Sequence, residues 1–123
     1  GAWSEKYQHY LGITPPNDAD GVMQDIHWSA GLIGYFPTYS LGNLYAAQLF
    51  DKADEELGGL HQQFERGEFL PLKEWLVEKI HKPGRCYSAS ELIERVTGKP
   101  LSHSHLVNYL YGKLGPLYGI ERP

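Results

Sequence analysis

An all-α fold is predicted by the distribution of apolar residues along the chain. These residues recur every three or four positions within separate segments, and each segment ends at glycine or proline. No segment alternates apolar and polar residues with the period of two that marks a half-buried strand. The 123 residues are enough for one domain or part of a larger one, and the apolar fraction of 41% is enough for a core.

The first helix is expected to end near residue 11. Four residues at helical spacing form its apolar face: Trp3, Tyr7, Tyr10 and Leu11. Gly12 and Pro15-Pro16 stop this helix, and residues 17–21 form a polar loop. Because the pattern begins abruptly, we expect the helix to start upstream, and we interpret Gly1-Ala2 as a cloning remnant. Residues 21–37 are expected to form short turns or a broken helix, because their glycines lower helix propensity.

Two longer helices are predicted next. Residues 38–57 show a helical pattern that Gly58-Gly59 ends. Its apolar face contains Leu41, Leu44, Tyr45, Gln48, Leu49 and Ala53. Residues 69–80 form the second helix, with Pro71 near the first turn, where the missing N–H of proline costs nothing. Residues 82–84 close it.

Two further helices complete the predicted fold. Ser88 and Glu91 have the spacing of a capping box, in which each side chain bonds the other residue's backbone N–H. The short helix that follows ends at Thr97-Gly98. The last helix is capped by Ser102 or Ser104 and is expected to finish at Gly115-Pro116.

Composition excludes some classes of partner. The net charge is −4 and no basic stripe is present, which argues against nucleic acid as a partner. No apolar run approaches the roughly 20 residues that span a bilayer, so no membrane association is expected. Cys86 is the one cysteine, so no internal disulfide can form, and a reducing, cytoplasmic setting is favoured.

The segment from residue 21 to residue 39 carries the most chemistry. Its polar and aromatic side chains are Gln24, Asp25, His27, Trp28, Tyr35 and Tyr39. A helix core does not need this mixture, which can supply a general acid, an oxyanion donor and an aromatic wall. His27 is the strongest candidate, because histidine titrates near neutral pH and can donate from either ring nitrogen. Its structural alternative is a satisfied, partly buried histidine.

The other residues of this segment also have two interpretations. The phenol of Tyr39 can donate to a developing oxyanion, or the ring can pack at a helix start. Pro37 fixes the backbone between Tyr35 and Tyr39 and is expected to hold them in relation to each other. Asp25 can orient His27 or accept bonds from turn amides. Trp28 lines a pocket or fills the core.

Other reactive residues have simpler interpretations. His103 and His105 stand two apart at a helix start without a nearby cysteine, so a solvated pair is favoured over a zinc site. The acids at 54–56 are interpreted as a solvated face. Cys86 lacks a partnered base and is not expected to be catalytic. No His-Glu-x-x-His motif, phosphate-binding loop or nucleophile elbow is present.

The segment Gly21-x-x-Gln24-Asp25-x-His27-Trp28 resembles the Gly-x-x-Gln-Asp-x-His-Trp signature of the Taq carboxypeptidase (M32) family of metallocarboxypeptidases. The run that follows, residues 34–42, also resembles that family. Later matches occur in order at Trp75-Leu76, Ile80-His81, Tyr87, Glu91-Leu92-Ile93, Thr97-Gly98 and Tyr118-Gly119-Ile120. The resemblance therefore covers nearly the whole chain.

The resemblance implies that residues 1–123 are the C-terminal helical subdomain of a larger, zincin-like, all-helical metallopeptidase. Members of the family hold a divalent metal, zinc or cobalt, with a His-Glu-x-x-His helix and a further glutamate, all upstream of this region. The chain is therefore expected to bind no metal and to be inactive alone. Its implied partners are peptide substrates, the upstream part of the same protein and a second copy in a homodimer.

The implied reaction is release of C-terminal amino acids from peptides. Metal-activated water attacks the last peptide bond, with a glutamate as general base. Related helical zincin peptidases stabilise the oxyanion with a histidine and a tyrosine, and the resemblance assigns these catalytic roles to His27 and Tyr39. The substrate-binding residues it assigns are Gln24, Asp25, Trp28 and Tyr35. Gln24 and Asp25 form part of the wall that limits the substrate's C-terminal end.

Two alternatives remain open from the sequence. The chain could be a helical protein-interaction module that keeps an enzyme-derived scaffold without its chemistry. An independent zinc site at His103 and His105 is a weaker alternative.

Overall fold

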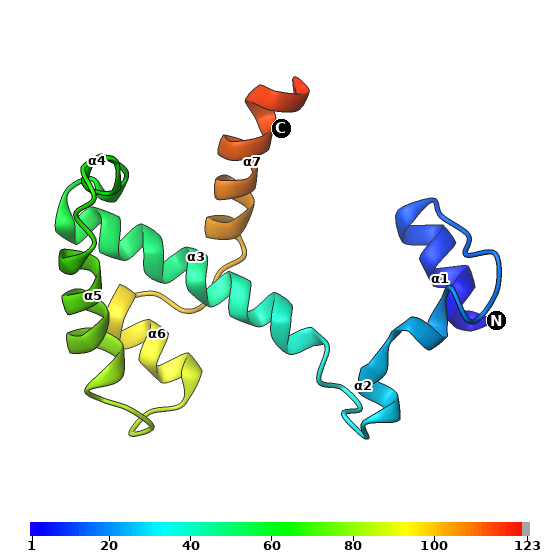
Figure 1. The fold of residues 1–123 in the computed structure, drawn as a ribbon. Helices are drawn as coiled ribbons and strands as arrows, with labels where there is room; N and C mark the ends of the chain where they lie inside the picture. The colour runs from blue at the N-terminus through cyan, green and yellow to red at the C-terminus, as the bar shows by residue number, and fades with distance from the viewer. Residues whose placement is uncertain (122–123) are drawn as a thin grey trace. The chain divides into compact units, whose positions relative to one another are not determined.

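A computed structural model describes residues 1–121, and all the regular elements in that range are helical. This confirms the prediction of an all-α fold. The elements are α1 (Ala2–Leu11), the 3-10 turn η1 (Val22–Gln24), α2 (Ile26–Ser29), α3 (Pro37–Leu57), α4 (Leu60–Glu65), α5 (Leu70–Leu76), the π-helical turn η2 (Val77–His81), α6 (Ala89–Thr97) and α7 (Ser104–Tyr118) (Figure 1).

The chain divides into two compact units. The first unit is Gly1–Thr38 and contains α1, η1 and α2, and the second unit is Tyr39–Pro123. α3 begins in the last residues of the first unit and continues into the second.

The first unit is organised by α1 and by the broken segment that follows it. Gly12 ends α1 in the left-handed conformation, with φ 69°, and its N–H donates to the carbonyl of Gln8. Trp3 and Tyr7 stack on α1 with ring centroids 4.5 Å apart. Between residues 21 and 37 the chain forms two short helical turns, η1 and α2, that meet at Asp25. The prediction of short turns there is confirmed.

The second unit has its core where α3, α4, α5 and α6 meet. Ile93 of α6 is buried, and four other buried side chains form the central cluster: Ala53, Leu60, Trp75 and Val96. Partly buried residues pack around them: Leu49, Phe50, Leu57, Phe64, Leu72, Leu76, Ile80 and Leu92. In Figure 1, α5 and α6 lie along the same side of α3, and α4 lies at its C-terminal end. Apolar area removed from water contributes roughly 25 cal/mol per Å², so this cluster is the main stabilising element of the second unit.

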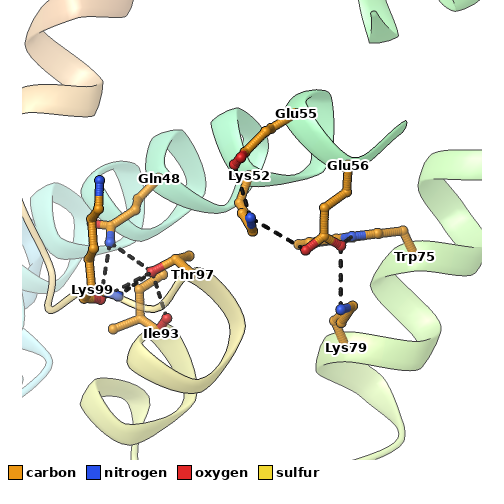
Figure 2. Close-up of polar contacts among 9 residues, drawn as sticks. All are labelled: Gln48, Lys52, Glu55, Glu56, Trp75, Lys79, Ile93, Thr97 and Lys99. Atoms are coloured by element: carbon orange, nitrogen blue, oxygen red, sulfur yellow. Dashed lines mark hydrogen bonds and ion pairs between the residues drawn. The ribbon is translucent and has the colours of Figure 1, made fainter. Parts of the chain in front are cut away.

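Gln48 is the one polar side chain in the core of the described residues. It is 1% exposed and lies on the inner face of α3. Its Nε2 donates to Thr97 Oγ1 at 3.1 Å and to the carbonyls of Lys99 and Pro100 at 3.3 and 3.1 Å. Its Oε1 accepts from the backbone N–H of Ser102 at 2.9 Å. One amide therefore holds the α6–α7 connection against α3 (Figure 2).

The acids at the end of α3 also connect helices. Glu56 accepts a 2.7 Å hydrogen bond from Trp75 Nε1 of α5 and lies 3.3 Å from Lys79 Nζ of η2 (Figure 2). Asp54 Oδ1 accepts from the backbone N–H of Leu60 at 2.6 Å, which supports the start of α4. The interpretation of residues 54–56 as only a solvated face is therefore wrong for Asp54 and Glu56, which bond to groups outside α3.

One helix and the ends of two others differ from the sequence-based expectation. α4 was not predicted, because a six-residue helix shows too little periodicity. The helix expected over 69–80 becomes π-helical after Leu76, with the N–H of Lys82 bonded to the carbonyl of Val77 at 2.9 Å. α7 continues past Pro116 and ends at Tyr118, where Gly119 takes the left-handed conformation. The expected end at Gly115-Pro116 is therefore wrong.

The capping box of α6 is confirmed. The Ser88 hydroxyl accepts from the N–H of Glu91, and the Glu91 carboxylate accepts from the N–H of Ser88 at 2.8 Å. The Ser88 hydroxyl also donates to the Glu91 carboxylate at 2.6 Å, and this bond, followed by the bond from the Ser88 N–H, lowers the pKa of Glu91. No side chain caps α7 in the same way, although Ser102 Oγ accepts from the N–H of Ser104 at 3.2 Å.

We predict that Gln48→Leu destabilises the chain by about 1–3 kcal/mol, because the buried groups bonded to the amide lose their partner while the volume is kept. Asn43→Leu is the matched control, since Asn43 is an exposed amide on the same helix, and a change within about 0.5 kcal/mol is expected. Urea unfolding measures both. Equal effects of the two substitutions would contradict the role given to Gln48.

A second prediction concerns pH. The hydrogen bond from Trp75, followed by the bond and charge of Lys79, lowers the pKa of Glu56 below its ordinary value of 4.5. A lowered folded-state pKa adds stability that is present above about pH 4.5 and is lost as the pH falls further. Glu56→Gln keeps an acceptor for Trp75 but cannot ionise. We therefore expect the variant to be less stable at pH 7 and to approach the wild type near pH 3.

Urea midpoints at pH 7, 4.5 and 3 test this prediction. Glu55→Gln is the control, because Glu55 is 71% exposed in its side chain and pairs only with Lys52 among the described contacts. A stability gap between wild type and Glu56→Gln that does not narrow with acid would show that Glu56 does not stabilise the fold as a charged group.

Candidate active site

An open groove of about 830 Å³ lies within the first unit. Its aromatic and apolar lining comes from α1, from the loop after it and from the segment around α2: Trp3, Tyr7, Ile13, Pro15, Pro16, Ile26, Trp28 and Phe36. Its polar lining includes Gln24, Asp25 and His27, three of the residues that the sequence analysis selected. A mainly apolar groove with a few convergent polar groups is the usual form of a ligand site.

Asp25 joins the backbone and the ring of His27. It stands at the N-cap of α2, where its Oδ1 accepts from the backbone N–H of His27 at 2.8 Å. The same Oδ1 lies 2.7 Å from His27 Nδ1. The backbone bond, followed by the ring contact, lowers the pKa of Asp25. Both interpretations left open by the sequence are therefore realised, since the carboxylate accepts a turn amide and also orients the histidine.

The contact with Asp25 fixes the tautomer of His27. A carboxylate is an acceptor only, so Nδ1 carries a proton and donates it to Asp25. The side chain of His27 is only 16% exposed, and aromatic rings enclose it. Tyr35 stacks on it with centroids 5.8 Å apart, and Phe36 approaches edge-on at 5.4 Å. His27 is therefore held by Asp25 through Nδ1 and by the rings of Tyr35 and Phe36.

Gln24 has a structural bond in addition to its place in the groove. Its Nε2 donates to the carbonyl of Ala19 at 2.6 Å, which ties η1 to the preceding loop. Its Oε1 is an acceptor on the same side chain. Trp28 lines the groove and remains 51% exposed, so it is a wall residue and not part of a core.

Tyr39 lies in the first turn of α3 and belongs to the second unit. It is 53% exposed. The structure thus brings Asp25, His27 and Tyr35 together within the first unit, whereas Tyr39 belongs to the second unit. In the first unit, the N–H and hydroxyl of Thr38 both donate to the carbonyl of Tyr35, at 2.9 and 2.7 Å. A fixed relation between Tyr35 and Tyr39 stays a prediction.

Two residues of the site were missed by the sequence analysis. Phe36 contacts the His27 ring, and aromatic identity next to Tyr35 was its only signal. Gly21 is the one buried residue within 1–38. A Cβ at Gly21 would lie 3.1 Å from the Asn17 carbonyl and from Pro15 Cβ, and 3.3 Å from the Trp3 ring. The first glycine of the signature therefore allows the loop and α1 to approach.

No metal site is formed by the residues that the structure describes. Within 1–121, no group of three or more His, Cys, Asp or Glu side chains could hold a metal ion. His105 instead contacts Asp51 of α3 through Nδ1, at 2.6 Å. The residues present therefore do not fit the metal centre that the resemblance implies.

The sequence profile of the family described as carboxypeptidase Taq (M32) metallopeptidase matches residues 1–114. The chain belongs to this family. It is 52% identical to thermostable carboxypeptidase 1 of Thermus thermophilus over 118 residues, which are 96% of this chain and 23% of that protein. It is 48% identical to carboxypeptidase 1 of Bacillus subtilis, again over 23% of that protein.

A solved structure of the same family shares the fold. The M32 carboxypeptidase from Deinococcus radiodurans R1 superposes with a TM-score of 0.91 and 42% identity, covering 97% of this chain and 24% of that one. The chain spans about a quarter of the length of these relatives. Among the described residues, no helix has the length and apolarity needed to cross a membrane.

The close packing around Gly21 leads to a prediction for this metallopeptidase segment. Gly21→Ala should lower the stability of the first unit by about 1–3 kcal/mol, because three neighbours must move to admit the methyl group. Hydrogen exchange at the amide of Met23, which bonds the carbonyl of Asp18 at 3.0 Å, measures the local effect.

Gly42→Ala is the matched control. A Cβ at Gly42 meets no atom within 4 Å, and the position is helical, so this substitution should be neutral or stabilise by up to about 1 kcal/mol. Unchanged protection of Met23 in Gly21→Ala would show that the loop accommodates the methyl group without loss.

Proposed function

We propose that this chain is the C-terminal quarter of a metal-dependent carboxypeptidase that releases C-terminal amino acids from peptides. Membership of the M32 family supports the reaction class. The observation that carries the proposal for this region is the Asp25–His27 contact inside the groove of the first unit. A half-buried histidine fixed by a carboxylate and opening onto a groove has the form of a catalytic group.

His27 and Tyr39 are proposed to stabilise the transition state. When the last peptide bond is attacked, negative charge develops on its carbonyl oxygen, and donors already in place stabilise it at little reorganisation cost. Nε2 of His27 supplies one donor when the ring is protonated, since Nδ1 is already bonded to Asp25. The phenol O–H of Tyr39 supplies a second.

Substrate binding is proposed for the groove residues around His27. Gln24 and Asp25 form part of the wall that limits the C-terminal end of the peptide, and Trp28 is its aromatic part. Tyr35 does not line the groove and is included because it stacks on His27. The amide of Gln24 is tied to Ala19, so the wall is held by the loop behind it. Trp28 is 51% exposed, which leaves part of its ring accessible to a substrate.

The metal, zinc or cobalt, is proposed to be held by upstream residues of the same protein, because residues 1–121 do not form a site for it. When bound, it supplies an activated water and a Lewis acid. The chain alone is accordingly proposed to be inactive. We also propose a cytoplasmic location and a homodimer for the complete protein, and the single cysteine, Cys86, agrees with the reducing location.

The test of this proposal is kinetic and uses the longer protein that carries this chain. Tyr39→Phe and His27→Ala should each lower kcat by about 10²–10³ for release of the last residue from an N-blocked peptide, with a modest effect on KM. Tyr10→Phe is the control, because Tyr10 is 71% exposed on α1 and does not line the groove, and it should keep full activity.

Unchanged kcat in both variants would remove the assigned roles of His27 and Tyr39. Absence of any peptidase activity in the metal-loaded longer protein would instead favour a non-catalytic interaction module. Activity in the isolated chain would contradict the proposal that the metal centre lies upstream.

A further inference from the structure

We infer that Asp25 is the positioning residue of the proposed active site, and that its carboxylate holds His27 so that the ring acts on the substrate as a cationic donor through Nε2. This inference rests on the proposed function of His27. It changes the role of Asp25 from a wall residue to a group that acts through the histidine. Phe36 and Tyr35 share that supporting role.

The positions of the two ring protons of His27 decide whether Nε2 can donate. Asp25 Oδ1 is 2.7 Å from His27 Nδ1, so one ring proton is committed to the carboxylate. A neutral ring in this tautomer presents a lone pair at Nε2 and can only accept. To donate to a developing oxyanion, Nε2 must also carry a proton, and the ring is then an imidazolium. The donor role therefore requires a site that stabilises the cation.

The groups around the His27 ring stabilise its protonated, cationic form. The carboxylate of Asp25, 2.7 Å from Nδ1, forms an ion pair with the ring when the ring is protonated. The stacked face of Tyr35, 5.8 Å away, adds a cation–π attraction. The edge contact of Phe36 limits rotation of the ring. The low exposure of the histidine reduces screening by water.

The other titratable groups near the ring do not replace Asp25. Asp20 and Tyr7 line the same groove, from the preceding loop and from α1. The carboxylate of Asp20 accepts from Asn17 Nδ2 at 2.8 Å, and its backbone N–H donates to Asn17 Oδ1, which fixes it within its own loop. Asp25 is the carboxylate of this groove that contacts the imidazole.

One oxygen of Asp25, Oδ1, contacts both the backbone N–H and the ring Nδ1 of His27. The bond to the His27 backbone N–H places the start of α2, and the bond to Nδ1 places the ring relative to that backbone. The side chain and the main chain of His27 therefore share a reference point. A residue that only lined the substrate pocket would not need both bonds.

The test measures pH–rate profiles for peptide hydrolysis by the longer protein. Asp25→Asn keeps an oxygen acceptor for the backbone N–H but removes the charge. We expect the alkaline limb of kcat to move down by roughly one pH unit, which lowers kcat about tenfold above the limb, with KM little changed. Asp18→Asn is the control, because Asp18 does not line the groove, and its profile should match that of the wild type.

A second readout follows the ring directly. In ¹⁵N spectra of the longer protein, His27 should show the Nδ1–H tautomer when neutral, and Asp25→Ala should abolish this preference. A profile for Asp25→Asn that matches the wild type, while His27→Ala is impaired, would overturn the inference and leave the proposed function standing. Full activity of His27→Ala would instead remove the role of His27 itself.

Discussion

The first unit depends on one carboxylate that bonds the same residue at two points. Asp25 caps α2 through the backbone N–H of His27 and holds the imidazole through Nδ1. The rings of Tyr35 and Phe36 then enclose the histidine from the following loop. Behind this arrangement, the lack of a side chain at Gly21 permits close approach of the loop and Trp3. The shape of the groove follows from these local contacts more than from a large core.

The second unit is stabilised differently. Its core is apolar, and single polar groups fix how its helices are joined. Gln48 satisfies the α6–α7 connection, and Glu56 links the end of α3 to Trp75 and Lys79. The bonds of Gln48 fix geometry as well as adding stability, because a buried amide must find partners for its donors and its acceptor. The unit therefore has a defined helix arrangement despite its modest core.

Much of the fold could be predicted because its signals are local. Gly12 and Gly98 end their helices in the left-handed conformation that glycine adopts easily, and Ser88 with Glu91 forms the expected capping box. α4 could not be predicted, because six residues show too little periodicity and the start of the helix depends on the burial of Leu60 and on its N–H bond to Asp54.

The same distinction applies to the site. The composition of residues 21–39 identified His27 and Asp25, but their contact could not be deduced, since a carboxylate two positions before a histidine can cap, orient or do both. The packing role of Gly21 depends on Trp3 and Pro15, which sequence spacing does not place beside it.

His27 and Tyr39 are proposed to face the reacting carbonyl of a peptide. The most direct measurement is a crystal structure of the longer protein with a tetrahedral peptide analogue bound. We expect His27 Nε2 and the Tyr39 hydroxyl to lie within about 2.7–3.1 Å of the analogue's oxyanion, with Asp25 still bonded to Nδ1. An analogue bound with neither residue in reach of that oxygen would contradict this proposal.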